Sequence, residues 1–147
     1  MIVAFLQNMW GKNPAKVKAM LERTHPESER DELRLRLIKY SLFDGCLTGR
    51  RLRAAFGDVL CEAILWEEST REIAGDPKTI FPAQPEHIRA VLEKYQPGTV
   101  VTFGKIAANA VAPLWTGPIV HCPHPAARQS TVMDELKNAA KQLWWHR

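Results

Sequence analysis

The 147-residue sequence lacks any run of about 18 or more apolar residues, the length that lets a helix span a bilayer. Its N-terminus has neither a basic leader nor a small-residue cleavage site, so the sequence gives no support for export. It has only three cysteines, and none belongs to a Cys-x-x-Cys pair of the kind that binds zinc or does redox chemistry. We therefore expect a soluble, cytoplasmic protein with reduced thiols and with neither a metal nor a cofactor.

The sequence also lacks an acidic excess, since 20 Lys and Arg residues outnumber 16 Asp and Glu residues and leave a net charge of +4. A positive balance favours partners that carry phosphates, although a surplus of this size also occurs in proteins that never bind nucleic acid. Apolar residues make up 46% of the chain, which is enough to bury one continuous core. We expect a single domain over residues 1–147.

Strand and helix patterns alternate along the chain. Apolar and β-branched runs predict strands at residues 2–7, 60–66, 99–103 and 118–121. Helical spacing of apolar residues, with Pro or Gly at several boundaries, predicts helices that begin at residue 14 and that cover residues 27–42, 50–56, 85–95, 106–111 and 130–145. This order predicts a three-layer α/β/α fold with a central, mainly parallel sheet of about four strands. Ligands of such sheets bind at the carboxyl ends of the strands.

The loops after the predicted strands should meet at that edge of the sheet, and the loop at residues 121–128 is the most informative. His124 lies there between Pro123 and Pro125, which stiffen the backbone just beyond a strand. A histidine held in this way can hydrogen-bond or protonate a ligand without first being ordered. The alternative is that His124 only braces a turn.

Residues 124–128, His-Pro-Ala-Ala-Arg, resemble the His-Pro-Ser-Pro type of motif that ends the last strand of uracil-DNA glycosylases. Residues 99–107 are similar to the strand-Gly-helix unit of that superfamily, and residues 49–57 resemble the helix before its base-reading strand. By order of elements the resemblance covers most of residues 45–145 and, more loosely, residues 2–14. It implies a compact uracil-DNA glycosylase-like fold and an enzyme that hydrolyses the N-glycosidic bond of a flipped uracil-related or modified base in DNA.

The resemblance also implies catalytic roles. In the family, an Asp or Asn after the first strand positions the water, and the late histidine, here His124, stabilises negative charge on the departing base. Residues 11–14, Gly-Lys-Asn-Pro, resemble the Gly-x-Asn-Pro version of the first motif, which gives Asn13 the water-positioning role. Because residues 7–10 separate this motif from the strand, Asn8 is a rival for the role. Asn13 is also a good N-cap for a helix that starts at Pro14.

The expected base-reading position departs from the family. Members that excise uracil usually have an Asn at the end of the middle strand, where this chain has Trp-Glu-Glu-Ser at residues 66–69. An ionised carboxylate only accepts hydrogen bonds, so Glu67 or Glu68 in a pocket would disfavour a carbonyl edge and suit an amino or hydroxyl donor. Alternatively, a carboxylate has become the catalytic group, or one of the two is solvated or paired with Arg71.

Two other side chains are expected beside the base. The ring of Trp10 could stack on a base for about 1–3 kcal/mol, although an aromatic next to Met9 is as often a hydrophobic lid. His121, which ends the last predicted strand, is the second. Cations expected to contact the DNA backbone, or alternatively only to keep the surface soluble, are Lys12, Arg50, Arg51, Lys105 and Arg128.

The sequence thus predicts a metal-independent DNA glycosylase that acts on single- or double-stranded DNA. One alternative is a DNA-binding module that kept the fold and lost the chemistry. Another is a nucleotide-modifying enzyme that reuses the same pocket.

Overall fold

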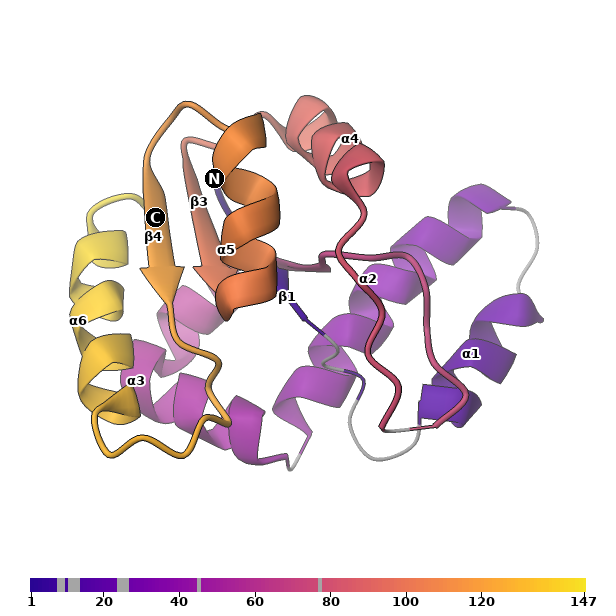
Figure 1. The fold of residues 1–147 in the computed structure, drawn as a ribbon, viewed down its shortest axis with the longest axis horizontal. Coiled ribbons are helices and arrows are strands. Elements are labelled where there is room, and N and C mark those ends of the chain that lie inside the picture. Colours follow the sequence, from indigo (N-terminus) through magenta and orange to yellow (C-terminus); the bar gives the residue numbers. More distant parts are fainter. Residues whose placement is uncertain (8–9, 11–13, 24–26, 45, 77) are drawn as a thin grey trace.

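The computed structural model describes residues 1–147 except 8–9, 11–13, 24–26, 45 and 77 (Figure 1). Within the described residues, one sheet contains the strands β1 (Ile2–Leu6), β2 (Ile64–Glu68), β3 (Thr99–Phe103) and β4 (Ile119–Cys122). The strands lie in the order β2-β1-β3-β4, and every neighbouring pair is parallel. The predicted α/β fold with a four-stranded parallel sheet is confirmed.

Helices cover both faces of this sheet. They are α1 (Pro14–Glu22), α2 (Glu27–Phe43), α3 (Leu47–Ala63), α4 (Pro85–Tyr95), α5 (Lys105–Val111) and α6 (Val132–Trp144), with a short 3-10 helix, η1 (Ala112–Leu114), after α5. Apolar residues of α2, α3 and α6 pack on one face, and those of α4 and α5 pack on the other (Figure 1). The result is the expected three-layer arrangement.

The first strand, β1, is apolar throughout because both of its faces are buried. Ile2, Ala4 and Leu6 face the layer of α3 and α6, whereas Val3 and Phe5 face α4 and α5. Successive side chains of a strand point to opposite faces, and here both faces are covered. An uninterrupted apolar run is therefore the correct pattern for a central parallel strand, and the strand predicted at the N-terminus is confirmed.

The segment 60–66, predicted to be a strand, is divided between a helix and a strand. Gly57 interrupts α3 with a φ of 81°, but the helix resumes and ends at Ala63, so β2 begins only at Ile64. A short buried apolar run fits either a helix end or a strand, which is why the sequence misplaced this boundary. As a consequence, Glu67 and Glu68 lie within β2 and not beyond it.

The strand order creates a switch point between β1 and β3. The chain leaves β1 over one face, through α1 to α3, and it leaves β3 over the opposite face, through α5. Ligands of open parallel sheets bind at such a point, because the connections diverge and leave a crevice at the carboxyl ends of the strands. Here Gln7 follows β1 and Gly104 follows β3, so both lie at the switch point.

Candidate functional site

A cavity of about 470 Å³ lies at the carboxyl ends of β1 and β3. Its volume falls within the range of about 300–1,000 Å³ that is usual for small-molecule pockets. The segments that follow all four strands contribute to it, and its lining residues are Gln7, Ile80, Phe103, Gly104, Lys105, Ile106 and His124. Two of the predicted site residues, His124 and Lys105, therefore line one cavity at the switch point.

Gly104 lets the turn after β3 pass beside the histidine. Its φ of 89° lies in the region that side chains disfavour, and a Cβ atom at this position would lie 3.7 Å from the His124 Cβ. The Gly104 N–H also donates to the Cys122 carbonyl at 2.9 Å, which joins the ends of β3 and β4. This turn thus holds α5 and the loop of His124 on the same wall of the cavity.

The His124 ring has a defined protonation pattern. The Ala126 backbone N–H donates to His124 Nδ1 at 3.1 Å, so Nδ1 is an acceptor and the proton of the neutral ring is on Nε2. Burial lowers the pKa of His124 below the ordinary 6.5, and a hydrogen bond with the Gln7 backbone opposes this shift only in part. At neutral pH the side chain is therefore uncharged, and its Nε2–H is the ring group that hydrogen-bonds to the Gln7 backbone.

Arg51 fixes the loop that carries this histidine. Its Nη1 atom donates to the carbonyl of Pro125 at 2.7 Å and to the carbonyl of Ala127 at 2.9 Å. These bonds tie the loop to α3, from which Arg51 comes. Arg51 is half-buried and its Nη1 is engaged with the chain's own backbone, so it positions this loop, and its DNA contact stays a prediction.

The other predicted DNA-binding cations are distributed around this loop. Lys105 is exposed at the cavity, where it begins α5. Arg50 and Arg128 are also exposed, and each lies one residue away from the contact between Arg51 and Ala127. Lys12 lies outside the described residues, so its role stays a prediction.

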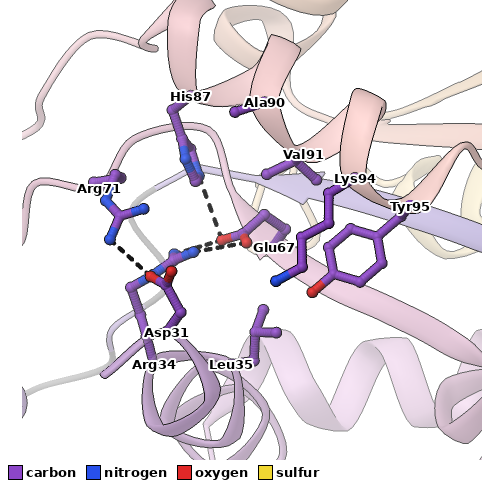
Figure 2. Close-up of a pocket in the computed structure, with 10 residues that line it drawn as sticks. All are labelled: Asp31, Arg34, Leu35, Glu67, Arg71, His87, Ala90, Val91, Lys94 and Tyr95. Atoms are coloured by element: carbon purple, nitrogen blue, oxygen red, sulfur yellow. Dashed lines mark hydrogen bonds and ion pairs between the residues drawn. The ribbon is translucent and has the colours of Figure 1, made fainter. Parts of the chain in front are cut away.

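A second, smaller hollow of about 120 Å³ lies at the edge of β2, between α2 and α4 (Figure 2). Arg34 donates from both terminal nitrogens to the Glu67 carboxylate, at 2.5 and 2.7 Å. His87 Nε2 lies 3.5 Å from the same carboxylate and 3.1 Å from the Glu68 carbonyl. All of these side chains are buried. We refer to Arg34, Glu67 and His87 as the Glu67 cluster.

The carboxylate of Glu67 is ionised within this cluster. Burial opposes its charge, but hydrogen bonds from His87 and Arg34 outweigh burial and lower the pKa of Glu67 below 4.5. Arg71, the other partner considered for this carboxylate, instead pairs with Asp31 at 2.7 Å. Glu67 therefore bridges α2, β2 and α4.

The prediction that Glu67 or Glu68 reads a base beside His124 is wrong. Glu67 turns toward α2 and α4 at the edge of the sheet, and both of its oxygens are bound by Arg34 (Figure 2). Neither carboxylate is among the described residues that line the His124 cavity. Glu68 is fully buried inside β2. The sequence placed both residues at a loop because it ended the strand too early.

Trp10 and His121 also lie outside the lining of the cavity. Trp10 is 4% exposed and packs in the core cluster that contains α3 and α6, so it cannot stack on a base, and packing in the core replaces the predicted stacking. His121 is exposed on β4, where its Nδ1 lies 2.5 Å from the Thr102 hydroxyl of β3. Asn8 and Asn13 lie outside the described residues, and their water-positioning roles stay predictions.

Three polar residues of these two sites were missed by the sequence reasoning. Gln7 had one sequence signal, its position as the last residue of the first predicted strand, at the ligand-binding edge of the sheet. Arg34 had a weaker sequence signal, its position between Leu33 and Leu35 in a predicted helix. His87 had none that separates it from a surface histidine in an amphipathic helix.

The described residues include no group of three or more His, Cys, Asp or Glu side chains that could hold a metal ion. The three cysteines are free thiols, as predicted. None of the helices in the described part of the chain is long and apolar enough to cross a membrane. A scan of protein-family models and searches of curated proteins and of solved structures find no match to this chain.

Proposed function

We propose that this chain is a DNA glycosylase that binds a flipped base in the His124 cavity and hydrolyses its N-glycosidic bond. The observation that carries the proposal is His124, a neutral donor with a fixed tautomer on the wall of a cavity at the switch point. The resemblance of residues 124–128 to the glycosylase motif supports the same role.

The proposed reaction breaks the bond between the sugar C1′ and the base nitrogen, and water adds its oxygen to C1′. The departing base gains negative charge, which a proton released from the water finally neutralises. His124 Nε2–H donates to a base oxygen and stabilises this charge as it develops. A preorganised donor of this kind contributes about 10²–10³ to kcat. Asn8 or Asn13 positions the water.

The surface around the cavity suits a nucleic acid. Lys105, Arg50 and Arg128 are exposed cations near the cavity or the loop of His124, and phosphate contacts are their proposed role. Ile80 and Ile106 line the cavity and remain 59% and 43% exposed. Such apolar side chains suit contact with the faces of bases.

A strand-cleavage assay tests the proposal. Single- and double-stranded oligonucleotides that carry uracil, hydroxymethyluracil or another modified base are treated with protein and then with alkali, which cuts at abasic sites. We expect cleavage with the wild type and a loss of about 10²–10³ in kcat for His124→Ala. His121→Ala is the matched control, because this exposed histidine lies outside the cavity. Asn8→Ala and Asn13→Ala show which amide positions the water.

The pH profile adds a readout specific to His124. Because its pKa lies below 6.5, activity should persist through pH 6.5 and decline at lower pH. A proton on Nδ1 would oppose the Ala126 N–H and disturb the loop. Salt-sensitive DNA binding without an abasic product on any base would contradict the proposal and favour the DNA-binding module.

A further inference from the structure

Gln7 is held in one orientation at the wall of the His124 cavity. Its side chain is 6% exposed, and its Nε2 donates to the backbone carbonyl of Phe81 at 2.5 Å. A carbonyl oxygen only accepts hydrogen bonds, so the NH₂ end of the amide must face Phe81. The other end of the side chain is therefore fixed as an acceptor.

That acceptor is unsatisfied. Gln7 Oε1 is buried and has no hydrogen-bond partner among the described residues. Most buried polar atoms in proteins are paired, and an unpaired one in a cavity wall is accounted for when a ligand supplies the missing donor. Gln7 is one of the residues that line this cavity together with His124, so a ligand in the cavity is a candidate for the missing donor.

Gln7 and His124 are also neighbours, because the His124 ring contacts the Gln7 backbone. A ligand oxygen that replaces the Gln7 backbone as the partner of His124 Nε2–H would therefore lie next to an acceptor, Gln7 Oε1. The complementary ligand edge has a carbonyl oxygen beside a ring N–H group, which is the lactam pattern. Uracil, its 5-substituted derivatives and hypoxanthine carry this edge, whereas cytosine and adenine do not.

We propose that Gln7 is the base-reading residue of this protein and that it selects bases with a lactam edge. Its Oε1 accepts the ring N–H of the base, while His124 donates to the adjacent carbonyl oxygen. This proposal rests on the glycosylase function proposed above. It also reverses the specificity expected from Glu67, since the acceptor in the cavity is an uncharged amide that lies beside a donor.

The first test changes the substrate and leaves the protein intact. Oligonucleotides that carry uracil or 3-methyluracil at the same position differ by one N–H group, which the methyl group replaces. We expect the wild type to process uracil with a kcat/KM about 10- to 100-fold higher, the effect of one buried hydrogen bond. Equal kcat/KM values would overturn the proposal.

The second test separates the hydrogen bond from the bulk of the methyl group. Gln7→Met keeps an unbranched side chain of similar length but has no amide acceptor. Its preference for uracil over 3-methyluracil should fall to less than about 3-fold, because most of the wild-type preference comes from the hydrogen bond. Gln84→Met makes the same chemical change outside the cavity, where Gln84 accepts from the Arg71 N–H, and should keep the wild-type preference. A Gln7→Met variant that discriminates as well as the wild type would overturn the proposal.

Failure of this proposal and failure of the glycosylase function give different results. If the wild type releases bases but Gln7→Met keeps the full preference, only the role of Gln7 is wrong. If the wild type releases no base, the glycosylase function fails, and the role of Gln7 is decided by binding of free uracil and 3-methyluracil, measured by NMR titration. Tighter binding of uracil that is lost in Gln7→Met supports base reading, and equal binding of the two ligands overturns it.

Discussion

The Glu67 cluster and the His124 cavity lie at the ends of strands in the same sheet, yet they use buried polar groups in opposite ways. In the cluster, both oxygens of Glu67 are bound by Arg34, and the buried Arg34 Nε has no partner among the described residues. In the cavity, Gln7 Oε1 has no such partner, and the neighbouring His124 ring is held by the backbone of Gln7 and of Ala126. Polar groups that satisfy one another hold elements together, whereas unsatisfied ones at a cavity are available to a ligand.

The largest effect is expected from breaking the Glu67 cluster. Glu67→Gln leaves the Arg34 guanidinium buried without its counter-charge, so the free energy of unfolding should fall by about 3–5 kcal/mol. Urea denaturation measures this change. The loss of stability should occur without any change in base preference, because the cluster does not line the His124 cavity.

Two further measurements sharpen this prediction. A double variant, Arg34→Met with Glu67→Leu, removes both charges and should recover much of the lost stability; a double variant less stable than Glu67→Gln would contradict the ion-pair interpretation. The folded-state pKa of Glu67 is lowered, so its contribution is present above pH 4.5 and is lost as the pH falls through the folded-state pKa. Glu67→Gln should lack this part of the acid sensitivity.

An intermediate effect is expected at the loop of the cavity. Arg51→Met removes two charged hydrogen bonds to backbone carbonyls, and the free energy of unfolding should fall by about 1–3 kcal/mol. A looser loop also exposes His124 to water, which should return its pKa toward 6.5 and move the acidic limb of the kcat/KM profile to higher pH.

Arg50→Met is the matched control for this pH shift. Arg50 is the exposed neighbour of Arg51, and its proposed contact is with DNA phosphate. Loss of Arg50 should reduce the slope of log K for DNA binding against log salt concentration by about one unit. The acidic limb of the kcat/KM profile should stay in place. An unchanged acidic limb in Arg51→Met would contradict a positioning role for Arg51.

The order of elements could be predicted from the sequence because local patterns report burial. The strand at Thr99–Phe103 and the helix at Pro85–Tyr95 have the predicted bounds, since Pro85 opens the helix and a Pro-Gly pair follows its end. The start of β2 could not be predicted in this way. There, one apolar run crosses from a helix into a strand, and only the pairing of β2 with β1 separates the two.

The sequence could predict a residue of the candidate site only where the signal lies in its immediate neighbours in the chain. His124 stands out because prolines flank it just after a strand. The role of Glu67 depends on Arg34, 33 residues earlier in the chain, and on how α2 packs at the edge of the sheet. The orientation of Gln7 depends on the carbonyl of Phe81, 74 residues later. No sequence pattern links such distant partners. From the sequence alone, a glutamate that is exposed cannot be told from a glutamate that forms a buried ion pair.

The smallest effect is expected at the rim of the Glu67 cluster, where Arg71 pairs with Asp31 (Figure 2). Both side chains contribute to the same groove as Glu67, and the pair is as short, at 2.7 Å, but the side chains are 48% and 41% exposed. Water and salt screen such a pair, so Arg71→Ala should change the free energy of unfolding by less than about 1 kcal/mol. Urea denaturation at low and high salt measures both the effect and its screening.

This last variant tests whether burial, and not the contact distance, determines how much each of the two ion pairs contributes to the free energy of unfolding. If Arg71→Ala destabilises the protein as strongly as Glu67→Gln, then the exposed pair and the buried cluster form one coupled network. In that case a variant that combines Arg71→Ala with Glu67→Gln would lose less stability than the sum of the single variants. Additive losses, with a small share from Arg71, are expected because Arg71 pairs with Asp31 whereas Glu67 is held by Arg34 and His87.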